Sequence, residues 1–173
     1  MSNSMPFAPV ETLFSLGANL GEPRATLQRA LDLLEAEYGP LVQSSFYETP
    51  PWGDAEQPAF LNVVVRGVAC VAPLTILRRC KEIEQELGRL PTHRWGPRAI
   101  DVDLLAYGAI TLMTPDLTLP HPRLSERGFV LVPLDEIAPD WRHPLLDRTA
   151  RELLDALPEA DVRGVTRLGS AAR

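Results

Sequence analysis

The spacing of apolar residues predicts four strands and two long helices in the first 107 residues. Branched or alternating apolar residues indicate strands over 10–16, 42–48, 60–68 and 100–107. Apolar residues three and four apart indicate two helices, each starting at a proline and followed by a glycine. The order strand, helix, two strands, helix, strand is the split βαβ plan. We therefore expect an α+β fold, a ferredoxin-like βαββαβ sheet with helices packed on it.

The two long helices are predicted over 23–38 and 73–87. In the second, we expect the buried face to consist of Leu74, Leu77, Cys80, Ile83 and Leu87. Shorter apolar stretches indicate a helix over 132–137 and a terminal helix over 149–157.

Composition agrees with one folded domain. The chain has 173 residues, of which 45% are hydrophobic and 23% charged, as is usual for a globular protein with its own core. We expect a flexible N-terminus over 1–9, a single domain over 10–160 and a weakly ordered C-terminal tail over 161–173. Two cysteines are too few for a disulfide scaffold. The chain starts without a secretory signal and has no apolar run of about 18 residues, so we expect a cytoplasmic protein that binds no membrane.

Charge narrows the classes of partner. Seventeen basic against 23 acidic residues give a formal net charge of −6, which disfavours binding to nucleic acid. Sixteen of the basic residues are arginine, and Lys81 is the single lysine. Recognition of phosphate by this chain therefore has to rely on guanidinium groups, backbone N–H groups or metal ions.

A pair of carboxylates is the first candidate for chemistry. Asp101 and Asp103 lie two apart on a predicted strand, so their side chains share one face, with Cα atoms about 6.6 Å apart. Carboxylates this close repel each other, and divalent cations between them remove that repulsion. Two such cations can also bridge the carboxylates to a polyphosphate.

The residues before this pair are positively charged. Between Glu86 and Asp101 the sequence has no acidic residue but contains Arg89, Arg94 and Arg98. Cations and arginines together neutralise and position phosphate groups, which is most of what phosphoryl transfer requires. These residues alone leave open a two-metal phosphoesterase, a non-catalytic ferredoxin-like ligand-binding module, and a plain solvated strand face with arginine partners. No Walker A loop is present.

A family resemblance is carried by the block Arg94-Trp-Gly-Pro-Arg-Ala-Ile-Asp-Val-Asp-Leu-Leu. It resembles the signature of the 6-hydroxymethyl-7,8-dihydropterin pyrophosphokinase family. Further blocks resemble that family in the same order: Gly17-Ala-Asn-Leu-Gly, Ser45-Phe-Tyr-Glu-Thr-Pro-Pro, Gln57-Pro-Ala-Phe-Leu-Asn, Leu119-Pro-His-Pro-Arg and Arg127-Gly-Phe-Val-Leu-Val-Pro-Leu. The resemblance implies transfer of pyrophosphate from ATP to the hydroxymethyl group of 6-hydroxymethyl-7,8-dihydropterin, with release of AMP, in folate biosynthesis.

The resemblance also implies which residues bind ATP and the metal. Two Mg²⁺ ions are expected on Asp101 and Asp103, with ATP as the co-substrate. The expected catalytic residues are Arg89, Arg98, Asp101 and Asp103. The expected ATP-binding residues are Glu84, Arg94, Trp95, Arg98, Leu104, His121 and Arg127.

The resemblance implies a second set of residues for the pterin: Thr49, Pro51, Trp52, Phe60, Asn62 and Phe129. Phe60 and Phe129 match the family's pair of rings on either side of the pterin, and the amide of Asn62 suits its polar edge. The loop after Arg89 lacks a further basic residue that many members carry, so we expect the phosphate clamp to differ there. We expect a monomer whose partners are ATP and the pterin.

Overall fold

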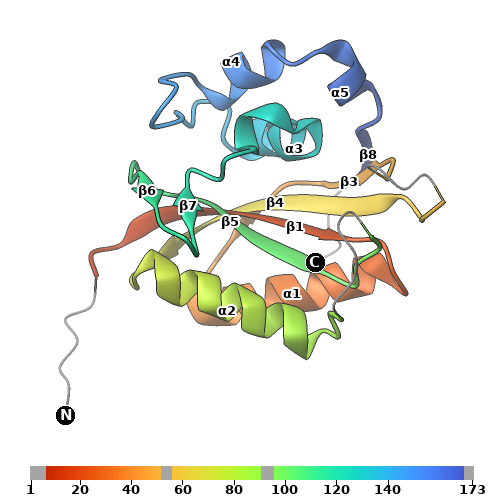
Figure 1. The fold of residues 1–173 in the computed structure, drawn as a ribbon, viewed down its shortest axis with the longest axis horizontal. Coiled ribbons are helices and arrows are strands. Elements are labelled where there is room, and N and C mark those ends of the chain that lie inside the picture. The colour runs from red at the N-terminus through yellow and green to blue at the C-terminus, as the bar shows by residue number, and fades with distance from the viewer. Residues whose placement is uncertain (1–6, 52–55, 91–95, 170–173) are drawn as a thin grey trace.

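The computed structural model of the chain describes residues 7–51, 56–90 and 96–169. Its centre is a six-stranded antiparallel sheet in the order β5-β1-β4-β3-β8, with the short β2 paired to β4 (Figure 1). The strands of this sheet are β1 (Val10–Ala18), β2 (Val42–Gln43), β3 (Phe46–Thr49), β4 (Phe60–Ala69), β5 (Asp101–Tyr107) and β8 (Thr166–Gly169). A separate two-stranded sheet consists of β6 (Leu112–Met113) and β7 (Thr118–Leu119).

Helices cover both faces of the six-stranded sheet. They are α1 (Pro23–Tyr38), α2 (Pro73–Glu86), the 3₁₀ turn η1 (Leu124–Glu126), α3 (Gly128–Ile137), α4 (Ala150–Asp155) and α5 (Glu159–Arg163). Figure 1 shows α1 and α2 on one face and α3 on the other, with α4 and α5 outside α3. The path β1-α1-β3-β4-α2-β5 and the strand order β5-β1-β4-β3 confirm the predicted ferredoxin-like βαββαβ plan.

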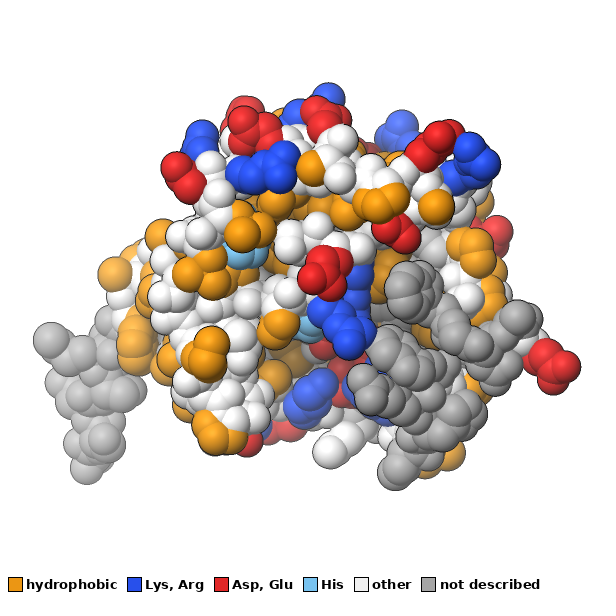
Figure 2. Space-filling view, turned by 45° about the horizontal axis from the view of Figure 1, so that its top comes forward, with side chains coloured by type: hydrophobic (Ala, Val, Ile, Leu, Met, Phe, Trp, Pro, Cys, Tyr) orange, Lys and Arg blue, Asp and Glu red, His pale blue; other side chains and the backbone are white. Residues whose placement is uncertain are grey.

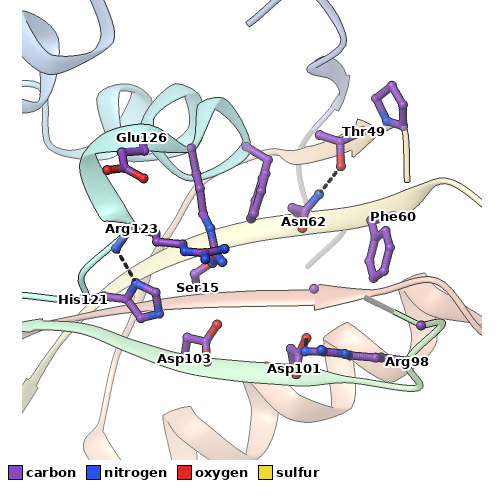
Figure 3. Close-up of a pocket in the computed structure, with 15 residues that line it drawn as sticks. Ser15, Thr49, Phe60, Asn62, Arg98, Asp101, Asp103, His121, Arg123 and Glu126 are labelled. Atoms are coloured by element: carbon purple, nitrogen blue, oxygen red, sulfur yellow. Dashed lines mark hydrogen bonds and ion pairs between the residues drawn. The ribbon is translucent and has the colours of Figure 1, made fainter. Parts of the chain in front are cut away.

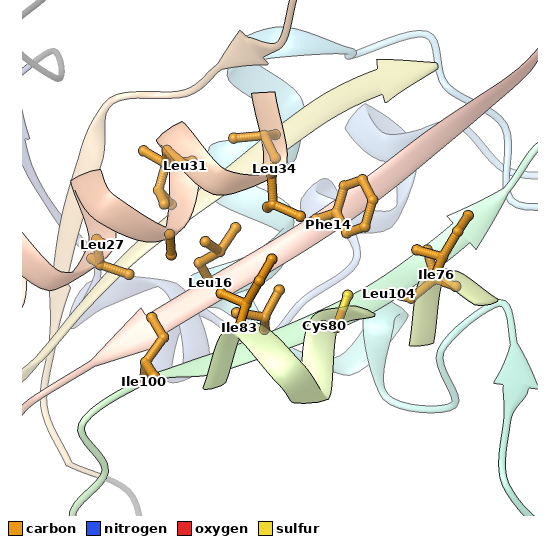
Figure 4. Packing of buried hydrophobic residues seen from close by; sticks show 14 of the residues in the cluster. Phe14, Leu16, Leu27, Leu31, Leu34, Ile76, Cys80, Ile83, Ile100 and Leu104 are labelled. Carbon is orange, nitrogen blue, oxygen red and sulfur yellow. The ribbon is translucent and has the colours of Figure 1, made fainter. Parts of the chain in front are cut away.

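The α1 and α2 face holds the larger hydrophobic core. From α1, the buried residues are Leu27, Ala30, Leu31 and Leu34, at the predicted helical spacing. They meet the fully buried Phe14 and Leu16 of β1 and Ile83 of α2 (Figure 4). Pro23 starts α1, and Gly39 ends it with a φ of 77°, a conformation that glycine adopts without strain.

The buried face of α2 differs in part from the prediction. Cys80 and Ile83 are fully buried as expected, but Leu74 is 50% exposed. Ile76 and Glu84 are buried instead, and together with Cys80 and Ile83 they follow helical spacing. Because Glu84 is acidic, the sequence pattern did not indicate a buried face that includes it, and the apolar Leu74 was assigned to the buried face in its place.

The opposite face holds a second core, in which Leu13, Val64 and Leu105 of the sheet pack against Leu131 and Leu134 of α3. Helix α3 begins at Gly128, several residues before the predicted start. Pro133, which was expected near the start of the helix, lies inside it. Helix α4 follows the prediction and starts at a capping box between Thr149 and Glu152.

Two further predictions about irregular segments need correction. The strand expected over 42–48 is divided into β2 and β3, because the Ser44 hydroxyl accepts the amide of Val64 between them. The expected C-terminal tail contains the end of α5 and the strand β8, which pairs with β3. No helix in the described part of the chain is long and apolar enough to cross a membrane.

Candidate active site

A cavity of about 600 Å³ opens on the α3 face of the sheet. Figure 2 shows arginine, histidine and acidic side chains gathered around this hollow near the middle of the view. Its lining consists of Ser15, Gly17, Thr49, Pro50, Phe60, Asn62, Gly96, Arg98, Asp101, Asp103, His121, Arg123, Glu126, Arg127 and Phe129. Residues far apart in the sequence therefore meet in one space.

The two aspartates form part of the floor of the cavity. In β5, Val102 and Leu104 point into the α1 and α2 core, so the alternation of the strand turns Asp101 and Asp103 to the cavity side (Figure 3). Ser15 of β1 lies directly opposite Asp103 in the antiparallel register. The period-two argument from the sequence thus correctly placed both carboxylates on one face.

A β-bulge interrupts β5 just after the aspartates. Leu13 pairs with Ala106 and the next residue, Phe14, pairs with Leu104, which leaves Leu105 as the extra residue. Leu105 and Ala106 both belong to the α3 core, whereas Tyr107 belongs to the α1 and α2 core. The Leu105 carbonyl accepts the backbone amide of His121 at 2.8 Å and so fixes the chain that carries this histidine.

Asp101 is held by two arginines. Nη1 of Arg98 lies 2.6 Å from Oδ2 of Asp101, and Nη1 of Arg89 lies 2.8 Å from Oδ1. The Arg89 guanidinium also contacts Glu84 at 2.5 Å. Glu84 is 2% exposed and further accepts the Val102 amide at 2.8 Å. Both oxygens of Asp101 are therefore neutralised, and Arg89 links that carboxylate to the buried acid of α2.

Asp103 has a different environment. Within the described part of the chain no hydrogen bond or ion pair holds its carboxylate. Burial, reinforced by the nearby charge of Asp101, raises the pKa of Asp103 above its ordinary value. A cation bound to this carboxylate would offset the cost of burying its charge and the repulsion between Asp103 and Asp101.

His121, Arg123 and Arg127 line the cavity above the aspartates. Burial, with the charges of Arg127 and Arg123, lowers the pKa of His121 to about 4, so its imidazole is neutral at pH 7. Nδ1 of His121 accepts the Arg123 amide at 3.2 Å, so the ring proton lies on Nε2 (Figure 3). Burial also lowers the pKa of Arg127, partly offset by Asp103. The Arg127 guanidinium lies 5.4 Å from the centre of the Phe129 ring.

Aromatic and amide groups line the other end of the cavity. The Asn62 amide donates to the Thr49 hydroxyl at 2.8 Å, and the Phe60 ring stands nearby on β4 (Figure 3). A Cβ at Gly17 would lie 2.9 Å from Oδ1 of Asn62, so only glycine leaves this amide in place. Thr49, Asn62 and the two phenylalanines offer polar edges and flat apolar faces, as a planar heterocycle requires.

Asn19 joins three segments behind the site. Its side-chain oxygen accepts the backbone amide of Arg98 at 2.8 Å, and its backbone amide donates to the Arg98 carbonyl at 3.1 Å. Its side-chain nitrogen donates to Gln57 and to the Pro58 carbonyl, both at 3.0 Å. The Gly17-Ala-Asn-Leu-Gly block thus fixes the backbone that leads into Arg98 and the segment before Phe60.

The donor set fits magnesium that arrives with a phosphate substrate. Among the described residues there is no group of three or more His, Cys, Asp and Glu side chains that could hold a metal by themselves. Mg²⁺ commonly binds through one or two carboxylates and completes its octahedron with substrate phosphates and water. Asp101 and Asp103 supply those two carboxylates.

Comparison with known families decides between the interpretations that the sequence left open. The sequence profile of 7,8-dihydro-6-hydroxymethylpterin-pyrophosphokinase (HPPK) matches residues 13–139. The chain belongs to the HPPK family. The resemblance found in the sequence is confirmed, and the phosphoesterase and the non-catalytic binding module gain no support.

Relatives of similar length carry the same name. The chain is 44% identical over 155 residues to a 2-amino-4-hydroxy-6-hydroxymethyldihydropteridine pyrophosphokinase of Methylorubrum extorquens, covering 88% of this chain and 95% of that protein. It is 40% identical over 159 residues to the enzyme of the same name from Pseudomonas aeruginosa, covering 91% and 96%.

Solved structures support the fold. The wild-type HPPK-DHPS of Plasmodium falciparum with pteroate matches with a TM-score of 0.70 at 17% identity, over 86% of this chain and 42% of that chain. The present chain therefore spans less than half of that longer protein. The HPPK domains confirm the ferredoxin-like architecture.

Most of the residues expected in an HPPK site line the cavity: Thr49, Phe60, Asn62, Arg98, Asp101, Asp103, His121, Arg127 and Phe129. Pro51 lies on a smaller neighbouring cavity. Arg89 reaches Asp101 without lining the main cavity, and Glu84 is buried behind it. The Leu104 side chain packs in the α1 and α2 core, and its expected contact with adenine stays a prediction. Trp52, Arg94 and Trp95 lie outside the described residues.

The cavity also contains residues that were not predicted: Ser15, Gly17, Pro50, Gly96, Arg123 and Glu126. Several of them, including Gly17, Pro50, Gly96 and Arg123, stand in the family blocks but were not assigned a role. Ser15 had a clear signal, because it alternates with Phe14 and Leu16 on an otherwise apolar strand.

Proposed function

We propose that this HPPK-family chain transfers pyrophosphate from ATP to the hydroxymethyl group of 6-hydroxymethyl-7,8-dihydropterin and releases AMP, in folate biosynthesis. The observation that supports this most directly is the layout of one cavity. A carboxylate pair with arginines stands at one end, and aromatic and amide groups suited to a planar heterocycle stand at the other.

Asp101 and Asp103 are the residues that would hold magnesium, and we propose two ions. Bound there, magnesium would neutralise phosphate charge and favour loss of the proton from the attacking hydroxyl. The buried carboxylate of Asp103, which no hydrogen bond or ion pair holds among the described residues, is the reason to place a cation on this pair. The described residues supply no third protein ligand, so the phosphates and water have to complete the coordination.

Arg89 and Arg98 would exchange partners when ATP binds. In the structure both are paired with Asp101. A cation on Asp101 would replace their positive charge there and leave the guanidinium groups free to bind phosphate oxygens, for which their planar geometry is suited. Arg98 lines the cavity, so it reaches the ligand with a small side-chain movement.

His121 and Arg127 would complete the phosphate site from above. The neutral His121 carries its proton on Nε2, because Nδ1 is occupied by the Arg123 amide, so it can donate a hydrogen bond to a phosphate oxygen without adding charge. Arg127 supplies positive charge in a buried place, where it acts more strongly than it would in water.

The pterin would lie between Phe60 and Phe129, with Asn62 and Thr49 at its polar edge. The Asn62–Thr49 hydrogen bond fixes the orientation of the amide before the substrate arrives. A pterin held in this way would have its hydroxymethyl group on the side of the aspartates, where it could meet the phosphates for in-line transfer.

The experiment is a product analysis. The protein is incubated with ATP, MgCl₂ and reduced hydroxymethylpterin, and the nucleotides are separated. AMP formed in equal amount to the pterin pyrophosphate, and absent without magnesium, supports the proposal. ADP as the product, or ATP hydrolysis that ignores the pterin, contradicts it. We further expect a monomer that binds no nucleic acid, in keeping with the net charge of −6.

A further inference from the structure

The segment from Pro158 to Gly169, here called the C-terminal segment, lies beyond residue 139, where the family match ends. It contains α5 and β8, and β8 pairs with β3 through Tyr47↔Arg167 and Glu48↔Thr166. Figure 1 shows it beside the end of β3 and next to α3. It therefore borders the two elements that carry the pterin end of the cavity.

The first contact with the site passes through the start of α3. A Cβ built on Gly128 would lie 2.0 Å from the carbonyl oxygen of Asp161, a distance that no side chain tolerates. The backbone of α5 thus lies directly on α3 at the residue that precedes Phe129. Any shift of α5 is transmitted to the backbone that carries this ring.

The second contact is with the segment after β3. A Cβ built on Gly164 would lie 3.0 Å from both Cγ and Cδ of Pro50, which itself lines the main cavity. Between these two contacts lies the neighbouring cavity of about 250 Å³. Its walls are shared by the site, through Thr49, Pro50, Pro51, Glu126, Arg127, Gly128 and Phe129, and by the C-terminal segment, through Ala160, Asp161, Gly164 and Val165.

A polar cluster anchors the segment on the other side. Arg167 donates from Nε to the Ser45 hydroxyl at 2.8 Å and from Nη2 to Glu136 at 3.2 Å. Glu136, near the end of α3, also accepts the Ser45 amide at 3.0 Å and the Tyr47 hydroxyl at 2.7 Å. One arginine of β8 is therefore tied to Ser45, just before β3, and to α3, while the glycine contacts reach Pro50, just after β3, and the start of α3.

We propose that the C-terminal segment is a positioning element for the pterin: it sets the distance between the Thr49–Pro51 segment and Phe129, and through it the affinity for the pterin. This inference rests on the proposed function. Among the described residues, no contact links the segment to Asp101 or Arg98. Arg127 of the phosphate site meets the segment only across the smaller cavity, and the anchor Arg167 binds at Ser45 and at Glu136 instead, so the main effect is expected on the pterin. Its residues are positioning residues, since they lie behind the cavity wall.

The test compares two arginines of the segment. Arg167→Met removes the anchor, and Arg163→Met is the matched control because Arg163 pairs only with the exposed Glu159 of its own helix among the described residues. We expect Arg167→Met to raise the KM for the pterin about two- to fivefold, the range that corresponds to one partly exposed ion pair. The KM for ATP and kcat are expected to stay within error, and Arg163→Met to behave as the unchanged protein.

A second pair of variants probes the wall itself. Gly164→Ala places a methyl group against Pro50 and is expected to raise the KM for the pterin while leaving the KM for ATP unchanged. Gly67→Ala is its control, because there the added Cβ would lie 2.6 Å from the end of the flexible Leu41 side chain, a tighter contact than at Gly164 but away from both cavities. This pair keeps the proposal testable should thermal melting show that Arg167→Met does not fold.

The outcomes separate the two levels of inference. An unchanged protein that makes no pterin pyrophosphate contradicts the proposed function. An active protein in which neither Arg167→Met nor Gly164→Ala alters the KM for the pterin overturns the positioning role alone. Equal rises in the KM for both substrates also overturn it, because they indicate a general loss of structure.

Discussion

The two faces of the central sheet are built from the same three strands but have opposite character. Toward α1 and α2, β1 presents Phe14 and Leu16, and β5 presents Val102 and Leu104, all nearly or fully buried. Toward α3, the intervening positions carry Ser15 and Gly17 on β1, Asn62 on β4, and Asp101 and Asp103 on β5. One face is a closed apolar layer, and the other combines a smaller core with a polar cavity. Stability and chemistry are therefore encoded at alternate residues of the same strands.

The strongest test of this separation is to neutralise the carboxylates. Asp101→Asn and Asp103→Asn are each expected to reduce turnover at least about a hundredfold, the scale seen when one group that stabilises developing charge is removed. Near-native rates in both variants would show that these residues hold no metal. Rates are measured with saturating magnesium and both substrates.

Asp103→Asn is also expected to raise the free energy of unfolding at pH 7. Burial raises the pKa of Asp103, so the native state keeps its proton to a higher pH than the unfolded chain does. Ionisation therefore costs stability as the pH rises above the unfolded value of 3.8, and the amide removes this cost. Thermal melts of the ligand-free protein should show a gain at pH 7 that shrinks toward pH 4. A lower melting temperature at pH 7 would contradict it.

On the opposite face the expected effect is reversed. Leu31→Ala removes a fully buried side chain from α1 and should lower the free energy of unfolding by about 2–5 kcal/mol. Turnover per folded molecule should hardly change, because the site lies across the sheet. Leu145→Ala, at a position 65% exposed, serves as the control in the same denaturant titration. A loss of kcat that exceeds the loss of folded protein would break the separation of the two faces.

Of the two arginines paired with Asp101, one should matter more for turnover and the other more for stability. Arg98 lines the cavity, so Arg98→Ala is expected to reduce kcat/KM about ten- to a hundredfold through lost charge-assisted hydrogen bonds. Arg89 neutralises the buried Glu84, so Arg89→Ala should affect turnover less and destabilise the fold more. Steady-state kinetics and urea titrations of both variants test this order. A larger fall of kcat/KM in Arg89→Ala than in Arg98→Ala, without a larger loss of stability, would contradict it.

Removing the rings should affect one substrate only. Phe60→Ala and Phe129→Ala are expected to weaken pterin binding by about 1–3 kcal/mol, or roughly 5- to 150-fold. ATP affinity should change little, because the phosphate end lies beyond the rings. Calorimetric titration with ATP alone, and with pterin beside an unreactive ATP analogue, separates the two. If both ligands weaken together, the rings act as core residues.

The last expected effect concerns the dependence of stability on pH. Burial beside arginines lowers the pKa of His121 from 6.5 to about 4, so between these values the unfolded chain binds a proton that the native state does not. Stability should therefore fall as the pH drops through this window. In His121→Gln that fall should be shallower, by at most about 1.4 kcal/mol per pH unit. Urea titrations at several pH values measure the slope, and identical slopes would indicate that His121 titrates normally.

Much of the fold could be predicted because local signals agreed with the global plan. Pro23 and Gly39 mark the ends of α1, and the period of two placed Asp101 and Asp103 on one face. The buried stripe of α2 was partly wrong because Glu84 is an acid on the apolar side of the helix. Its carboxylate pairs with Lys81 and Arg89, three and five residues away, and accepts the backbone amide of Val102 from β5. The contact with β5 exists only in the folded chain, so the apolar pattern of α2 does not reveal it.

The residues behind the site were the least predictable. The Leu104 side chain packs in the α1 and α2 core because strand alternation turns it away from Asp101 and Asp103, so an adenine contact of this residue would have to use its backbone. The strand β8 is short and wholly exposed, and it forms because β3 offers an edge and Arg167 finds Glu136 and Ser45 there. These contacts depend on three-dimensional proximity.

The bulge at Leu105 divides β5 into two halves that are out of phase. Without it, Tyr107 would share the side of Asp101 and Asp103, and its hydroxyl would lose the Val71 carbonyl that it reaches at 3.1 Å. One additional residue therefore lets alternate residues at the start of the strand face the candidate site, while Tyr107 at its end faces the α1 and α2 core. A gene that gained or lost a single codon here would reverse the orientation of one half while leaving the other intact. The number of residues in β5 therefore determines which face each half of the strand presents, a dependence that substitutions of single residues do not reveal.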